Sequence, residues 1–147
     1  MSFPTSRIGL NLTHATATWA APFATYYLFL QNRIVFHRLS NKKYIGDTTD
    51  PSKGTTDPLY VSTRAQLSFI ENVPFAMLLA LLVELNGAER KYINYALGTL
   101  LALRISHVEL GLMAKDNLGK GRILGYYGTQ VIMASLAGYT AYLVSNY

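Results

Sequence analysis

Three residues with complementary chemistry are spaced so that they share one face of a helix. Arg64, Ser68 and Glu71 stand at positions i, i+4 and i+7 of the segment STRAQLSFIENVPF, and this spacing aligns side chains on one helical face. The guanidinium fork of an arginine binds a carboxylate through two hydrogen bonds, while a glutamate among arginines can receive an ammonium group. The pattern predicts a site for a small molecule that carries both charges. An internal salt bridge between Arg64 and Glu71, about 10 Å apart along the helix, is the alternative.

A second set of charged residues is expected at the same depth. Arg104 and His107, in LRISHVEL, are three residues apart and therefore adjacent on a helix, whereas Glu109 points to the opposite side of the helix from His107. Arg33 and Arg122 lie at the ends of apolar segments, where snorkelling to a membrane interface is the alternative. Four arginines against two glutamates leave a surplus of about two positive charges, and arginine cannot lose its proton in a protein. We therefore expect an anion here, either a ligand or a lipid headgroup.

The elements that must position these residues are four apolar segments. Of the 147 residues, 50% are hydrophobic and 14% are charged, against about 25% charged in an average soluble domain. Because a membrane-spanning helix needs about 20 mostly apolar residues, the sequence predicts an all-α transmembrane four-helix bundle in a single domain, with spans at about 15–36, 61–85, 92–113 and 123–144. Residues 39–60 are rich in Gly, Pro, Asp, Thr and Ser and are predicted to form an exposed loop without an element. Asn86–Gly87 is a turn signal after the second span.

The lysines and arginines predict how this bundle is oriented. Nine belong to the first and third connections and the adjoining helix ends: Arg33, Arg38, Lys42, Lys43, Lys53, Arg64, Lys115, Lys120 and Arg122. The opposite face holds three: Arg7, Arg90 and Lys91. The positive-inside rule then places the first and third connections in the cytoplasm and both termini outside or in the lumen.

The composition argues against several other classes of site. The chain has no cysteine, which excludes disulfides, thiolate zinc sites and cysteine nucleophiles. Any sulfur chemistry would therefore come from a bound small molecule. Three scattered histidines give no spacing of metal ligands, so no metal site is expected. The net charge of +5 is not clustered on a polar background, which favours a membrane or an anionic ligand over nucleic acid.

The charged motifs are similar to those of a known family. RAQLSFIENVPF, LRISHVELG and GRILGYYGT, set in four predicted spans, resemble the MAPEG family (membrane-associated proteins in eicosanoid and glutathione metabolism), most closely its microbial and microsomal glutathione transferase-like branch. The resemblance runs from about residue 20 to the end of the chain. It implies a homotrimer of four-helix bundles in the endoplasmic reticulum or another intracellular membrane. It also implies that glutathione, as co-substrate, binds between neighbouring subunits near the cytoplasmic face.

The resemblance further implies roles for particular residues. Arg122 would be the catalytic residue, lowering the pKa of the glutathione thiol so that its thiolate attacks a lipophilic electrophile or a lipid hydroperoxide. The residues expected to bind glutathione are Arg33, Arg64, Ser68, Glu71, Arg104 and His107. Ser68 stands where the family usually has asparagine, and Gly111 replaces a tyrosine of the eicosanoid-making members. A general transferase is therefore expected rather than an eicosanoid synthase.

Two other functions stay open on the sequence alone. The chain could be a non-catalytic membrane subunit or scaffold that keeps the charges for helix packing, a reading that Ser68 and Gly111 favour. It could also bind an anionic lipid in the charged cavity. Apart from these sites, Glu84 is expected to be merely interfacial, and close helix packing rather than ligand contact is expected of Gly125, Gly128 and Gly138.

Overall fold

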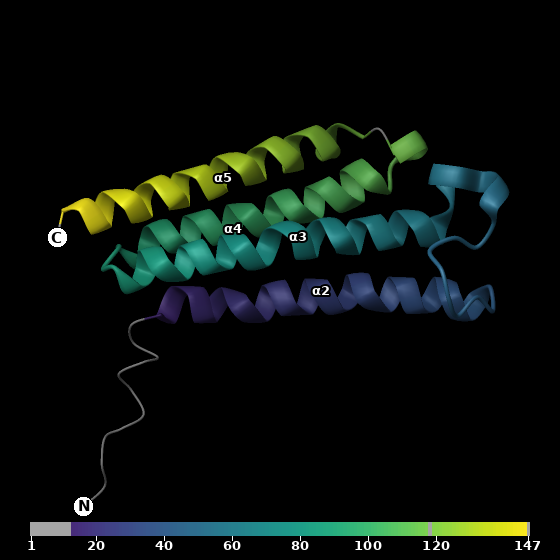
Figure 1. The fold of residues 1–147 in the computed structure, drawn as a ribbon, viewed down its shortest axis with the longest axis horizontal. Helices are drawn as coiled ribbons and strands as arrows, with labels where there is room; N and C mark the ends of the chain where they lie inside the picture. Colours follow the sequence, from purple (N-terminus) through teal and green to yellow (C-terminus); the bar gives the residue numbers. More distant parts are fainter. Residues whose placement is uncertain (1–12, 118, 147) are drawn as a thin grey trace, which may run out of the picture.

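Four long helices lie side by side in the part of the chain that the structure describes. The computed structural model describes residues 13–117 and 119–146. Its long helices are α2 (His14–Ser40), α3 (Pro58–Leu85), α4 (Arg90–His107) and α5 (Lys120–Ser145). In Figure 1, α3 and α4 lie between α2 and α5. The expected all-α bundle of four helices is confirmed for the described residues.

Three short elements complete the fold. The 3-10 helix η1 (Pro51–Thr56) precedes α3, the π-helical turn η2 (Val108–Leu112) continues α4, and the 3-10 turn η3 (Lys115–Asn117) precedes α5. The expectation of a loop without an element over residues 39–60 is therefore wrong in part. Both η1 and the start of α3 lie in this stretch because Asp50 and Asp57 cap them, each followed by a proline at the first helical position. The turn expected at Asn86–Gly87 is confirmed, since α3 ends at Leu85 and Gly87 has φ 87°.

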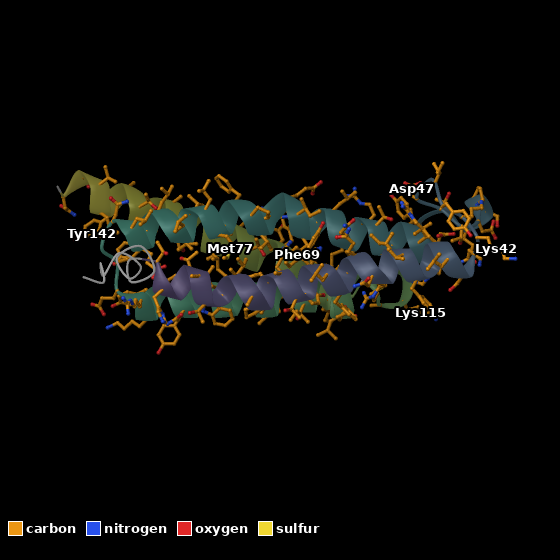
Figure 2. The ribbon with its side chains drawn as sticks, turned by 90° about the horizontal axis from the view of Figure 1, so that it is seen from below. Lys42, Asp47, Phe69, Met77, Lys115 and Tyr142 are labelled. Carbon is orange, nitrogen blue, oxygen red and sulfur yellow. The ribbon has the colours of Figure 1, made fainter. Side chains whose placement is uncertain are left out.

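The core forms along the buried face of α3. Six apolar residues spaced three or four apart are buried there: Ala65, Phe69, Val73, Ala76, Ala80 and Val83, as expected for one helical stripe that packs against its neighbours. Phe69 contacts three aromatic rings of α2, with centroids 6.3 Å from Phe23, 5.7 Å from Tyr26 and 6.1 Å from Tyr27. Figure 2 shows Phe69 between the helices, midway along the bundle. This aromatic cluster holds α2 against α3 next to the charged residues of the site.

Glycines allow α4 and α5 to approach closely at one end. A Cβ on Gly125 would collide with the Cβ of His107, and a Cβ on Gly128 would lie 2.6 Å from a side-chain carbon of Leu103. Close packing is therefore confirmed for Gly125 and Gly128. Within this chain Gly138 makes no such contact, because a Cβ there would meet no described atom within 4 Å. Gly138 lies about 140° round the helix from Gly125 at 3.6 residues per turn, so it faces away from α4.

The carboxylate of Glu84 has a structural role that corrects the expectation of an interfacial residue. Glu84 is buried at the end of α3 and accepts hydrogen bonds from the backbone N–H groups of Ala15 and Thr16, each at 2.8 Å, and from the Thr16 hydroxyl at 2.6 Å. These amides belong to the first turn of α2, where backbone donors lack helical partners and a negative charge is stabilised by the helix dipole. Glu84 thus joins the beginning of α2 to the end of α3.

We expect Glu84→Gln to destabilise the protein by about 1–3 kcal/mol, because the amide NH₂ would face backbone donors where the carboxylate now accepts. Thermal unfolding of the purified protein measures this loss as a lower Tm. Glu89→Gln is the matched control, since Glu89 is exposed and forms a surface ion pair with Lys91, a contact worth little. Equal Tm values for the two variants would contradict the role assigned to Glu84.

One helix of the described chain, α3, is long and apolar enough by length and composition to cross a membrane. The other long helices match the predicted spans in position, while spanning by all four stays a prediction. The first and third connections lie together at one end of the bundle: Figure 2 shows Lys42, Asp47 and Lys115 there and Tyr142 at the opposite end. This places the basic connections on one side, as the charge count expects, although Arg7 lies outside the described residues.

Candidate functional site

A cavity of about 620 Å³ lies at the end of the bundle where α3 and α5 begin and α4 ends. Its volume is within the range of about 300–1,000 Å³ that is usual for small-molecule sites. The charged and polar lining residues are Thr55, Tyr60, Arg64, Ser68, Glu71, Asn72, His107, Asn117, Arg122, Tyr126 and Tyr127. Arg64, Glu71 and Arg122 are exposed, so the cavity opens on the outside of the four-helix bundle.

The first half of α3 supplies one wall of this cavity. Arg64, Ser68 and Glu71 all line it, so the shared helix face expected from their spacing is confirmed. The Arg64–Glu71 salt bridge considered as an alternative does not form, and neither side chain makes a hydrogen bond or ion pair with another described residue. One positive and one negative group therefore face the cavity with their bonding capacity available to a ligand.

His107 and Arg122 form the facing wall, from the end of α4 and the start of α5. His107 is only 7% exposed. Its Nδ1 lies 3.0 Å from the backbone oxygen of Arg122 and its Nε2 lies 3.5 Å from Ser68 Oγ. The guanidinium of Arg122 is exposed and donates a long bond of 3.4 Å to the backbone oxygen of Asn117. Arg122 can therefore turn toward an anion in the cavity, while its backbone holds His107.

Arg104 lies behind the cavity and does not line it. It is 2% exposed, and its guanidinium donates to the backbone oxygen of Gly125 at 2.8 Å and to the backbone oxygen and Oγ of Ser68, both at 3.3 Å. Its Nε is buried without a partner among the described residues. Arg104 thus joins α4 to α3 and α5, and its charge reaches the site through Ser68 rather than by direct contact with the cavity.

Arg33 lies outside the cavity as well. Its Nη2 is 2.8 Å from Oε1 of Glu109, which also accepts from the Tyr26 hydroxyl at 3.3 Å, and its guanidinium stacks 4.6 Å from the Phe29 ring centre. Glu109 belongs to η2 and points away from His107, as the sequence predicts. The Arg33–Glu109 ion pair neutralises one positive and one negative charge. Arg64, Arg104 and Arg122 remain around the site together with Glu71, so the surplus of two positive charges is retained.

The cavity also contains residues that the motifs in the sequence do not single out. Asn72 stands one helical turn after Ser68 and lines the same wall, with its Nδ2 donating to the Ser68 backbone oxygen at 2.7 Å. Its i+4 spacing from Ser68 was a usable signal. Asn117 and Thr55 could not be found from spacing, because they meet only through a hydrogen bond of 2.8 Å between η3 and the end of η1.

Asp57 positions the segment that closes this end of the cavity. One carboxylate oxygen accepts from the N–H and hydroxyl of Thr49 and the N–H of Asp50, and the other caps α3 by accepting from Leu59 and Tyr60. Burial alone would raise the pKa of the Asp57 carboxyl, but these hydrogen bonds favour its charged form and together hold the pKa well below its usual range.

This shift predicts how stability depends on pH. The pKa of Asp57 in the folded protein is below its unfolded value of about 3.9. Its contribution to the free energy of unfolding is therefore fully present above the unfolded pKa and is lost as the pH falls toward the folded pKa. We expect Asp57→Asn to lower the Tm at pH 7 and to flatten its fall below pH 4. Asp47→Asn, which changes an exposed carboxylate of the same connection, should leave the acid profile unchanged. Parallel profiles for wild type and Asp57→Asn would contradict this assignment.

Comparison with known proteins identifies the family. Neither the curated proteins nor the solved structures gave a match. Residues 16–142 match the MAPEG family, which covers all four long helices apart from their outermost residues. The matched region contains every residue of the cavity described above. This chain therefore belongs to the MAPEG family.

Proposed function

We propose that this protein is a membrane-bound, glutathione-dependent transferase or peroxidase that acts on lipophilic electrophiles or lipid hydroperoxides. The MAPEG family is membrane-associated and includes glutathione transferases and peroxidases as well as non-catalytic members. The observation that carries the proposal is the cavity in which Arg64, Ser68, Glu71, His107 and Arg122 meet. All five stand at positions of the family motifs, and all except Ser68 have the residue type that the resemblance implies there.

The groups in the cavity fit the chemistry of glutathione. This tripeptide carries two carboxylates, one ammonium and one thiol, and the exposed guanidinium of Arg64 and carboxylate of Glu71 offer partners of both signs on one helix face. Ser68 lacks the amide that the family usually has at this position, but the Asn72 amide lines the same wall one turn further along. The cavity therefore offers partners for a carboxylate, for the ammonium group and for a peptide group, and the thiol still needs one.

Arg122 is the residue we assign to the thiol. A guanidinium beside the sulfur stabilises the thiolate relative to the thiol, and glutathione supplies the nucleophile that attacks an electrophilic carbon or a peroxide oxygen. Tyr126 and Tyr127, one turn after Arg122, add aromatic surface to the same cavity, where an apolar co-substrate would bind. Arg104 and Arg33 then support the site from behind and from α2, rather than by contact with glutathione.

The surface of the bundle supports a membrane location and self-association. Large apolar side chains are exposed on all four long helices, among them Phe36, Phe75, Ile105 and Val131, and extensive exposed apolar surface marks contact with lipid or protein. We propose a homotrimer embedded in the endoplasmic reticulum or another intracellular membrane, with the basic connections cytoplasmic. The open cavity would then lie at the boundary between neighbouring copies, with lipid supplying the apolar substrate.

Calorimetry and turnover test this function together. We expect glutathione to bind the detergent-solubilised protein with micromolar affinity, and a chlorinated aromatic or a lipid hydroperoxide to be consumed in its presence. Ophthalmic acid, which replaces the thiol by a methyl group, is the ligand control: it should bind similarly but support no turnover. No heat with either ligand at millimolar concentration would overturn the proposal.

The alternatives are a scaffold and a binder of anionic lipid. The scaffold reading is favoured by the use of Arg33 and Arg104 in contacts between helices. The lipid reading is favoured by the exposed arginines at the mouth of the cavity. Without glutathione binding, heat on addition of anionic lipid would support the lipid binder, and no heat with either would support the scaffold.

A further inference from the structure

A directed chain of hydrogen bonds connects Arg104, Ser68 and His107 with the backbone of Arg122. The Arg122 carbonyl oxygen can only accept, so Nδ1 of His107, 3.0 Å away, must carry a hydrogen. In the neutral ring, Nε2 then carries a lone pair, and Ser68 Oγ is the polar atom 3.5 Å from it. Arg104 can only donate, and it donates to Ser68 Oγ at 3.3 Å. The Ser68 hydroxyl is therefore left to donate to His107.

Ser68 differs in this respect from other hydroxyl residues in the helices. Ser62, Thr63 and Thr129 each donate to the backbone oxygen four residues earlier, at 2.7–2.9 Å, the usual arrangement inside a helix. Ser68 does not do this in the described structure, because its hydroxyl faces His107 across the gap between α3 and α4. Both groups line the cavity, so a ligand there can exchange a proton with this pair.

We propose that Ser68 and His107 accept the proton of the glutathione thiol. This inference rests on the proposed function and adds the base that Arg122, permanently charged, cannot provide. The S–H bond breaks with its electron pair left on sulfur, Ser68 Oγ takes the proton, and the Ser68 hydroxyl gives its own proton to His107 Nε2. The Nδ1 hydrogen bond to the Arg122 oxygen persists in the charged ring, where both nitrogens donate.

The charges around His107 make this proton transfer depend on the bound ligand. Arg104 on its own helix and Arg122 and Arg64 from α5 and α3 are positive, and Glu71 of α3 is the negative group facing the cavity. These positive neighbours disfavour protonation of the His107 ring, which would add one more positive charge to the group. A thiolate formed beside Arg122 adds the negative charge that compensates for it, so thiolate formation and ring protonation stabilise each other.

The same proton has a use in one of the two proposed reactions. When the thiolate displaces chloride from an aromatic carbon, the leaving chloride needs no proton, and His107 returns its proton to water. When the thiolate attacks a hydroperoxide, an S–O bond forms, the O–O bond breaks, and the leaving alkoxide takes the proton from His107. A second glutathione then converts the sulfenic acid to a disulfide and water. His107 would thus matter more to peroxide reduction than to conjugation.

The test is His107→Asn, which keeps the hydrogen bond to the backbone but lacks the base. The asparagine Nδ2 takes the place of Nδ1 and can still donate to the Arg122 oxygen, while nothing replaces Nε2. With glutathione bound and no electrophile present, we expect the thiolate absorbance at neutral pH to fall about tenfold and to return at high pH, where hydroxide takes the proton. We expect conjugation to fall about tenfold and peroxide reduction about 10²-fold, in the range of general acid–base catalysis.

A second pair of variants tests whether the loss of thiolate in His107→Asn comes only from a change in structure. Ser68→Ala removes the relaying hydroxyl and should shift the thiolate profile in the same direction as His107→Asn. Ser62→Ala removes a hydroxyl bonded within α3 and should not. If glutathione binds and the thiolate profiles of wild type, His107→Asn and Ser68→Ala coincide, the proton-accepting pair is refuted and the transferase proposal stands. If wild type binds no glutathione, both proposals fail.

Discussion

Arg122→Ala is expected to lower conjugation and peroxide reduction by about 10²–10³-fold, the usual effect of removing one group that stabilises a developing anion. The substitution removes the guanidinium but keeps the backbone oxygen that holds His107 at 3.0 Å. The loss therefore reports the charge itself and not the position of the histidine. Initial rates with saturating glutathione, together with the thiolate absorbance of the bound complex, measure this effect.

Two variants make this result specific to the cavity. Arg122→Lys keeps a positive charge and should retain part of the activity. Arg38→Ala removes an arginine near the same end of the bundle that bonds to the backbone of Gly46 rather than facing the cavity, so its rates should stay within about twofold of wild type. Wild-type rates in Arg122→Ala would remove this residue from the mechanism.

Gly125→Ala is expected to damage both the fold and the activity. A Cβ at this position would overlap the Cβ of His107 and lie 2.7 Å from the backbone oxygen of Leu103, so α4 and α5 must separate. Overpacking of this kind costs about 1–3 kcal/mol. It would also disturb the hydrogen bond of 2.8 Å from Arg104 to the Gly125 oxygen and displace Arg122 and His107. A misplacement of about 1 Å can cost 10²-fold in rate.

The same helix offers the matched control for this substitution. Gly138→Ala adds a Cβ that meets no described atom within 4 Å, and alanine is the better helix former by about 1 kcal/mol. We expect Gly138→Ala to keep the activity and to raise the Tm slightly, while Gly125→Ala lowers both. Similar behaviour of the two variants, measured by thermal unfolding and initial rates, would contradict the close α4–α5 contact.

Local regularity made one wall of the site predictable. Arg64, Ser68 and Glu71 share a helix face because 3.6 residues per turn align positions i, i+4 and i+7, and the structure confirms that all three line the cavity. The same regularity placed Arg104 beside His107 and turned Glu109 away from it. The separation of the basic connections from the opposite end of the bundle also follows from the order of helices along the chain.

What each arginine does could not be predicted in the same way. Arg33 and Arg104 have the charge and the depth expected of ligand-binding residues, yet Arg33 pairs with Glu109 and Arg104 donates to backbone oxygens of α3 and α5. Their partners are 21 to 76 residues away along the chain, and two of them are backbone oxygens. A spacing pattern within one helix carries no information about such contacts.

The sequence by itself determined the four long helices and the charged faces, because these depend on composition and on repeats of three or four residues, while its motifs carried the resemblance to the MAPEG family. Only the tertiary structure decided which charges meet in the cavity and which are used between helices. Glu84 illustrates the difference: its position near the end of a helix suggests an interfacial carboxylate, but the packing of α2 against α3 brings unpaired amides to it. The roles of such residues depend on the direction and distance of partners that only the packed bundle supplies.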